Sequence, residues 1–274
     1  MTKRRCAAPP TTRLFLPVTK REIIICRDGD ELSRRAAEQF VTLARQAIAA
    51  RGRFSVALSG GSTPKALYSL LATGEFSERL AWRQIHLFWG DERCVAPDHA
   101  ESNFRMVKES LLSRTIIPTE NVHRMAGEKA PAVAAAEYEI QLRKHFHIED
   151  DTVPRFDLVL LGLGEDGHTA SLFPGSSALN ETRQLVAMTY VEKLNAHRLT
   201  LTLPVINNAA QITFLIAGQG KAAVVKKILG NEAGRALYPA ARIEPHSGEC
   251  AWMITADAAA ESVVRKATNP DYSR

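Results

Sequence analysis

The chain has 274 residues, of which 45% are hydrophobic and 24% charged, the composition of an ordinary globular protein. The net charge of +5 comes from the first 21 residues, which hold six basic residues and no acidic one, so the other 253 residues have a net charge of −1. This balanced body predicts no nucleic-acid partner. No apolar run approaches the about 18 residues that a membrane helix needs, so we also expect no membrane partner.

Strand and helix patterns alternate along the chain, beginning with a short β-branched run at 22–26. Asp28 and Glu31 then form a capping signal, and apolar residues recur at spacings of three and four until Gly52 ends the predicted helix. In chain order, the next predicted elements are a strand at 53–58, a helix at 64–71, a strand at 85–89, helices at 101–113 and 132–146, strands at 156–161, 185–190, 198–203 and 212–217, a helix at 221–229, a strand at 251–255 and a helix at 258–266.

Near-continuous apolar strands separated by helices are typical of parallel sheets that helices cover on both faces. We therefore predict an α/β fold with an open, mostly parallel, Rossmann-like sheet. The chain shows neither an internal repeat nor a clear linker, which favours one α/β domain at residues 21–274. Residues 1–20, which contain Pro9, Pro10 and Pro17, are expected to form a basic, flexible N-terminal tail.

The four cysteines are scattered along the chain, with no C-x-x-C pair and no histidine at metal-ligand spacing: Cys6, Cys26, Cys94 and Cys250. This pattern predicts reduced thiols and no metal site. The amino terminus also lacks the apolar core of a secretory signal. We therefore expect a cytoplasmic protein.

Ligands of open α/β sheets bind beyond the carboxyl ends of the strands, so the loops after the strands are the expected binding region. Ser59-Gly60-Gly61-Ser62-Thr63 has the features of a phosphate cradle: glycines that let the backbone approach an anion, hydroxyl donors, and a helix that opens near Pro64. The Walker pattern G-x-x-x-x-G-K-[ST] is absent. The alternative is a glycine turn in which Ser or Thr caps the helix.

Three basic residues belong to the same group of loops and strand ends. Lys221 ends Gly218-Gln-Gly-Lys221, at the start of a predicted helix, where its charge can meet an anion. Arg93 ends Gly90-Asp-Glu-Arg93 and Arg198 opens a predicted strand, and either guanidinium can bind phosphate or carboxylate with two hydrogen bonds. The alternatives are a solvated lysine and arginines that pair with neighbouring acids.

His168 is the strongest catalytic candidate, since it follows a predicted strand in a glycine-bounded loop with Asp166 two residues before it. A neutral imidazole can accept a proton from water near neutral pH, and a nearby carboxylate can fix its tautomer. A structural histidine is the alternative interpretation. The nucleophile-elbow pattern G-x-S-x-G is absent, which favours water over a serine side chain as the attacking species.

The same loop contains Gly162-x-Gly-x-x-Gly167, the spacing of the dinucleotide-binding fingerprint. Its context argues against NAD. Glu165 and Asp166 would place two carboxylates against a pyrophosphate, and Pro174 leaves no room for the long helix of a Rossmann unit. No acidic residue lies about 20 positions later, on a following strand, to bind a ribose. We therefore interpret the glycines as turn residues that present the histidine, with no bound cofactor.

Five motifs in this order make the chain resemble the 6-phosphogluconolactonase family: LSGGSTP, FWGDER, FDLVLLGLGEDGHTASLFPG, HRLTLTLP and IAGQGKA. The resemblance extends from about Arg21 to Lys266. The pattern GxGxDGHTASLFPG is highly specific, whereas SGGSTP is shared more widely. The family is similar to glucosamine-6-phosphate deaminase, which implies the same open α/β sheet with a sugar phosphate at the strand ends.

The resemblance implies a carboxylic ester hydrolase that converts 6-phosphoglucono-δ-lactone to 6-phosphogluconate in the oxidative pentose phosphate pathway. By motif, His168 would be the general base that activates water, and Asp166 its orienting partner. Residues 59–63, Lys221 and Arg198 would bind the 6-phosphate. Arg93 would face either the phosphate or the lactone end. The resemblance implies no cofactor and no essential metal, and the sugar-phosphate lactone is the expected partner of a monomer or small homo-oligomer.

Two other classes of function remain as alternatives. A ring-opening deaminase of the same fold is expected to read IAFNEP after the catalytic histidine, where this chain reads TASLFP from Thr169 to Pro174. A non-catalytic sugar-phosphate sensor, as in effector domains of transcription regulators, would need a DNA-binding domain, for which the basic tail is too short.

Overall fold

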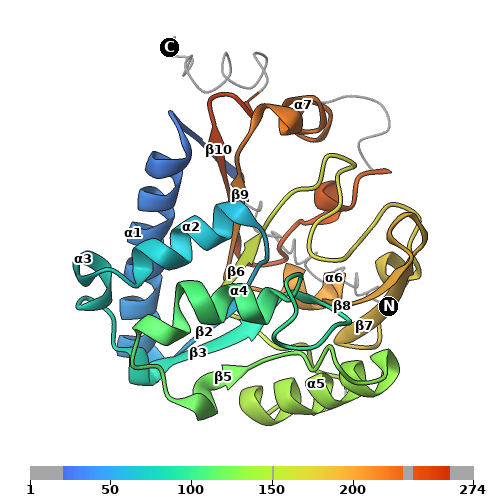
Figure 1. The fold of residues 1–274 in the computed structure, drawn as a ribbon, viewed down its shortest axis with the longest axis horizontal. Coiled ribbons are helices and arrows are strands. Elements are labelled where there is room, and N and C mark those ends of the chain that lie inside the picture. Colours follow the sequence, from blue (N-terminus) through green and yellow to red (C-terminus); the bar gives the residue numbers. More distant parts are fainter. Residues whose placement is uncertain (1–20, 150, 231–236, 260–274) are drawn as a thin grey trace, which may run out of the picture.

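The computed structural model describes residues 21–149, 151–230 and 237–259. The predicted tail at 1–20 lies outside these residues, as does most of the helix predicted at 258–266. Seven parallel strands form one sheet, and three further strands form a second, antiparallel sheet (Figure 1). The prediction of an α/β fold with an open, mostly parallel sheet is confirmed.

The large sheet has the strand order β1-β10-β9-β6-β2-β3-β5, and all neighbouring pairs in it are parallel. Its central strands β2, β6 and β9 are buried at every position, as expected for strands covered on both faces. The strands are β1 Arg21–Cys26, β2 Phe54–Leu58, β3 Ile85–Trp89, β5 Val122–His123, β6 Leu158–Leu161, β9 Gln211–Ile216 and β10 Glu249–Thr255.

The second sheet contains two strands that the sequence predicts only as members of the parallel pattern. β7 Val186–Val191 and β8 Ala196–Leu201 form a hairpin, and β4 Asp91–Arg93 pairs with the other side of β8. Alternate residues of β7 are exposed, which is typical of an antiparallel strand with one solvated face. The segment after β3, predicted as a loop, therefore includes a short strand that joins the two sheets.

Helix α1 (Gly29–Arg51) begins and ends where its sequence signals predict. The Asp28 carboxylate accepts a hydrogen bond from the Glu31 N–H at 2.9 Å, and Gly52 ends the helix in the left-handed conformation with φ 75°. The Glu31 carboxylate accepts from the Arg27 N–H rather than from Asp28, so the reciprocal bond of a capping box is displaced by one residue.

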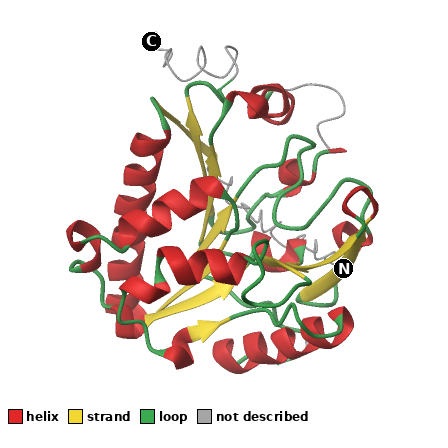
Figure 2. Ribbon diagram, viewed as in Figure 1, coloured by secondary structure: helices red, strands yellow, loops and turns green. Residues whose placement is uncertain are grey.

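The other helices cover the sheets on both sides, as Figure 2 shows. α1 packs against α2, β2 and β10, whereas α5 packs against β7 and β8. Among the described helices, none combines the length and apolar character that crossing a membrane requires. The bounds are α2 Ser62–Leu71, α3 Gly74–Ser77, α4 Asn103–Ser110, α5 Pro131–Phe146, α6 Leu203–Asn207 and α7 Ala222–Leu229.

The strand order explains how the loops predicted to bind the ligand come together. These four loops are residues 59–63, 90–93, 162–168 and 218–221. They follow β2, β3, β6 and β9, and these strands are adjacent in the order β9-β6-β2-β3. Because all four run parallel, their carboxyl ends lie at one edge of the sheet. Residues as far apart in the sequence as Ser59 and Lys221, 162 positions, therefore meet at that edge.

Candidate active site

A cleft of about 380 Å³ opens at the carboxyl ends of these four strands. Seven of the ten predicted site residues line it: Ser59, Gly60, Gly61, Arg93, His168, Arg198 and Lys221. The other three lie beside it. Asp166 contacts His168 from outside the cleft, and Ser62 and Thr63 belong to the first turn of α2.

The loop before α2 is held in place from the protein interior. The Ser59 N–H donates to the Tyr68 hydroxyl at 3.0 Å, and that hydroxyl donates to the Ser59 carbonyl at 2.9 Å. Tyr68 is fully buried on α2, so the helix and the loop that precedes it are tied together. The loop is thereby preorganised without using the Ser59 side chain.

Helix α2 begins at Ser62, two residues earlier than predicted, and Gly61 occupies the capping position. Gly61 has φ 104°, a conformation that residues with a Cβ rarely adopt. The alternative in which Ser or Thr caps the helix is therefore wrong. The first N–H groups of a helix have no partner within it, and with no side-chain cap those of α2 are available to an anion.

Arg93 and Arg198 are directly paired residues of the adjacent strands β4 and β8 in the second sheet. Arg198 is only 8% exposed, and burial together with the Arg93 charge lowers its pKa. The two guanidinium groups donate to backbone carbonyls, Arg93 to Glu101 and Arg198 to His197, rather than to carboxylates of the described residues. Among the described residues, neither arginine forms the ion pair with a neighbouring acid that the alternative interpretation expects.

Lys221 also lines the cleft, at the end of the short 3-10 turn Gln219–Lys221 and just before α7. Its Nζ lies 3.9 Å from Oε1 of Glu165, whose side chain is 71% exposed. A long ion pair with so exposed a carboxylate contributes little stability. The lysine is therefore able to exchange this partner for an anionic ligand.

His168 and Asp166 form the hydrogen-bonded pair that their spacing predicts. Nδ1 of His168 lies 2.5 Å from Oδ1 of Asp166, and the His168 backbone N–H donates to the same oxygen at 3.1 Å. The second carboxylate oxygen accepts from Nζ of Lys193. Burial raises the pKa of Asp166, but the hydrogen bonds from Lys193 and His168 outweigh it and hold the pKa at about 2. An ionised Asp166 fixes the Nδ1–H tautomer and leaves the lone pair at Nε2 of His168.

The glycines around this pair serve the turn. A Cβ added at Gly164 would collide with the His168 ring, and Gly167 has φ 79°. The Gly164 N–H donates to the His168 carbonyl at 2.8 Å, which closes the loop on itself. The His168 ring stacks on Phe173, with ring centroids 4.3 Å apart, so its orientation is fixed from two sides. These contacts agree with the interpretation of the glycines as turn residues.

Several further residues at the cleft are not marked by the spacing or chemistry of the sequence around them. Lys193 comes from the turn between β7 and β8, remote in sequence from the aspartate that it contacts. Asp91 accepts from the Ser171 hydroxyl at 2.7 Å, and Asn103 donates to the Asp91 carbonyl at 2.9 Å. Asp91 lies within FWGDER and Ser171 within GHTASLFPG, so only the family resemblance of these motifs could have indicated them. Phe173, which stacks on the catalytic candidate, also lies in such a motif.

A family model described as glucosamine-6-phosphate isomerases/6-phosphogluconolactonase matches residues 27–252. The chain belongs to this family. The resemblance that the motifs predict is therefore confirmed.

Individual members of the family match nearly the whole chain. The 6-phosphogluconolactonase of Nostoc sp. is 40% identical over 243 residues, which are 88% of this chain and 98% of the relative. That of Synechocystis sp. is 44% identical over 224 residues, 81% of this chain and 90% of the relative. The solved structure of 6-phosphogluconolactonase from Trypanosoma brucei is 30% identical, has a TM-score of 0.78, and covers 88% of this chain and 98% of its own.

Proposed function

We propose that the chain hydrolyses 6-phosphoglucono-δ-lactone to 6-phosphogluconate in the oxidative pentose phosphate pathway, the activity for which its relatives in Nostoc and Synechocystis are named. One observation carries the proposal. A single cleft is lined by a histidine that a carboxylate orients and by three cationic side chains, Arg93, Arg198 and Lys221. This arrangement suits a substrate with a neutral ester at one end and a phosphate at the other.

In the proposed reaction, Nε2 of His168 removes a proton from water while the water oxygen forms a bond to the lactone carbonyl carbon. The tetrahedral adduct then collapses, and the bond from that carbon to the ring oxygen breaks. The proton held by His168 passes to the ring oxygen, which becomes a hydroxyl. Ionised Asp166 stabilises the transient imidazolium, because its pKa of about 2 keeps it charged.

The 6-phosphate is assigned to the basic part of the cleft. The open N-terminus of α2 at residues 59–63, together with Arg198 and Lys221, offers backbone N–H groups and two positive charges to a dianion. Arg93 lies directly beside Arg198, so it can share the phosphate or reach the lactone carbonyl. A δ-lactone is an activated ester, and binding its remote phosphate positions the carbonyl for attack.

The test follows the loss of freshly made 6-phosphogluconolactone and compares it with the spontaneous rate. We expect turnover by the parent chain, a large loss in His168→Ala, and a raised KM in Lys221→Ala. Equal turnover of an unphosphorylated δ-lactone would contradict the phosphate assignment. Ammonia release from glucosamine 6-phosphate would instead favour the deaminase alternative, which TASLFP at Thr169 to Pro174 argues against.

We further propose that the protein works in the cytoplasm. The described cysteines, Cys26, Cys94 and Cys250, are free thiols, and two of them are buried. Free thiols persist in a reducing compartment, which supports this location.

A further inference from the structure

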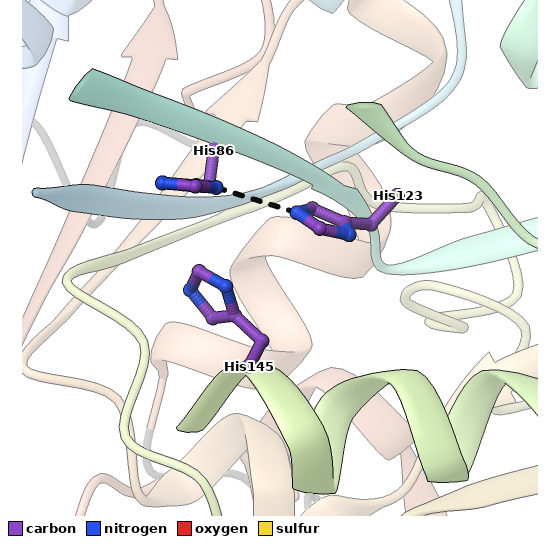
Figure 3. A group of neighbouring side chains, drawn as sticks. All are labelled: His86, His123 and His145. Carbon is purple, nitrogen blue, oxygen red and sulfur yellow. Dashed lines mark hydrogen bonds between the residues drawn. The ribbon is translucent and has the colours of Figure 1, made fainter. Parts of the chain in front are cut away.

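Three histidines from separate segments meet at the edge of the large sheet, away from the cleft. His86 comes from β3, His123 from the edge strand β5 and His145 from α5, and none of them lines the candidate active site. Figure 3 shows the three imidazoles facing a common space between the strands and the helix. One nitrogen from each ring lies within 4.8 Å of the corresponding nitrogens of the other two.

The spacing of these nitrogens suits a small metal ion. Two ligand nitrogens of a tetrahedral zinc ion, each at 2.0–2.1 Å from the metal, lie about 3.3 Å apart. Nδ1 of His86 and Nε2 of His123 are 3.4 Å apart. Since the three nitrogens lie within 4.8 Å of one another, the His145 ring has to approach the other two by at most about 1.5 Å for all three to reach one ion.

A hydrogen bond to one nitrogen of the His145 ring leaves the other nitrogen facing the cluster. Nε2 of His145 lies 2.8 Å from the Ser55 hydroxyl, so Nδ1 is the nitrogen left for a metal. Ser55 is itself fixed, because its backbone N–H donates to Asp157 at 2.7 Å. Histidine ligands of metals commonly hydrogen-bond through their second nitrogen, which sets the tautomer and the ring orientation.

Aromatic side chains and burial partly exclude water from the imidazoles. Phe88 stacks on His123 with centroids 4.2 Å apart, and Phe146 packs edge-on against His145. Burial lowers the pKa of His123 to about 4 and, with the nearby His86, the pKa of His145 to about 3. Coulomb repulsion from Arg53 and His147 also lowers the pKa of His145. This repulsion disfavours a bound cation, and the geometry of the three ligand nitrogens has to outweigh it.

We propose that His86, His123 and His145 form a binding site for a divalent transition-metal ion, and that Zn²⁺ is the ion they bind most tightly. Imidazole nitrogen is a preferred donor for zinc, and a three-histidine set leaves one coordination position for water. The ion would connect the two-residue strand β5 and helix α5 to the central sheet through β3. Its expected role is therefore to stabilise this edge of the fold, and it takes no part in the proposed hydrolysis.

The test uses the full chain without a histidine tag, stripped of metal with a chelator and titrated with ZnCl₂ by calorimetry. We expect saturable binding of one ion per chain and a melting temperature that rises with the zinc concentration. Co²⁺ serves as a second probe, because four-coordinate Co²⁺ gives intense visible absorption bands. Failure to bind either ion would overturn the proposal and would show that the three rings serve only aromatic packing.

Matched variants locate the ion. His123→Gln and His145→Gln should abolish the binding, whereas His246→Gln, at an exposed histidine, and His168→Ala, in the candidate active site, should retain it. Binding that survives both cluster substitutions would place the ion elsewhere and refute the site. Ser55→Ala keeps all three ligands and should weaken zinc affinity by on the order of 10-fold. Melting without metal and far-ultraviolet circular dichroism confirm that each variant is folded.

Discussion

Arg93 and Arg198 are direct cross-strand neighbours on β4 and β8, and both line the same cleft. Like charges placed opposite each other on antiparallel strands destabilise a sheet. Arg198 is also largely buried, so water only partly screens the repulsion between the two charges. The contact between the two charges therefore does not stabilise the sheet, and we interpret the pair as part of the proposed phosphate site.

Replacing Arg198 by Met keeps the apolar stem and removes the charge. We expect KM for the phosphorylated lactone to rise on the order of 10- to 100-fold, since a hydrogen bond to a charged group contributes about 1.5–3 kcal/mol. Turnover of an unphosphorylated δ-lactone should change little, because the lost contact is to phosphate. Steady-state kinetics on both substrates check this, and an equal loss on both would remove Arg198 from the phosphate site. The melting temperature should not fall, since a like-charge contact is relieved.

Replacing His168 by Ala should lower kcat by a factor on the order of 10² to 10⁴, the usual contribution of general base catalysis. KM should change far less, because the phosphate contacts remain. Stopped assays on freshly made lactone, corrected for spontaneous hydrolysis, measure both constants. His99→Ala, at an exposed histidine, provides the matched control and should behave as the parent. Near-parental kcat in His168→Ala would exclude this residue as the base.

Replacing Lys193 by Met should change the pH dependence of stability. The folded pKa of Asp166 is about 2, below its ordinary value of 3.8, so its ionised form stabilises the fold above about pH 4. That contribution is lost as the pH falls through 3.8 toward 2. Without Lys193 the folded pKa should move up toward 3.8, so the variant should be less stable than the parent at neutral pH.

Urea unfolding at a series of pH values measures this difference. The gap between Lys193→Met and the parent should be constant above about pH 4 and shrink below it. Lys144→Met, at an exposed lysine of α5, should show no such pH dependence. A gap that is independent of pH throughout would mean that Lys193 acts through packing on Phe173 rather than through Asp166.

Replacing Gly164 by Ala places a methyl group against the His168 ring. The ring has to shift, and a displacement of about 1 Å can reduce turnover on the order of 10²-fold. Gly29→Ala is the matched control, since a Cβ there has no atom within 4 Å. Kinetics and a crystal structure of the variant would show whether the histidine has moved. Parental kcat with an unmoved ring would show that the turn accommodates the methyl group at no cost.

The large sheet is predictable from the sequence because its strands are marked by apolar runs between helices. β3 is predicted with its observed bounds, and the other predicted strands deviate by at most two residues at an end. β4 and β5 escape detection because they have three and two residues, too few for any periodicity. That β7 and β8 leave the parallel sheet follows from their hairpin and from pairing with β4, which apolar patterns do not encode.

The candidate site is predictable where function concentrates in a short motif. His168 and Asp166 are two residues apart, so one loop suffices to indicate them. The contact of Lys193 with Asp166 is not predictable in this way, because the two residues are 27 positions apart. The histidine cluster is not predictable either, because its three members lie on three separate elements. Such contacts depend on strand order and on the placement of α5, which follow only from the folded chain.

The adjacency of β1 and β10 has a consequence for how the chain folds. β1 pairs with no other described strand, so Arg21–Cys26 cannot join the sheet until Glu249–Thr255 has formed. During synthesis, β1 therefore cannot pair until the ribosome has made the chain as far as β10. Contacts of such long sequence separation slow folding, because loop closure precedes any gain from pairing. The pairing of β1 with β10 is thus expected to be the last step in assembling the sheet. If synthesis stops before β10 is made, β1 is left as an unpaired strand that is prone to aggregate.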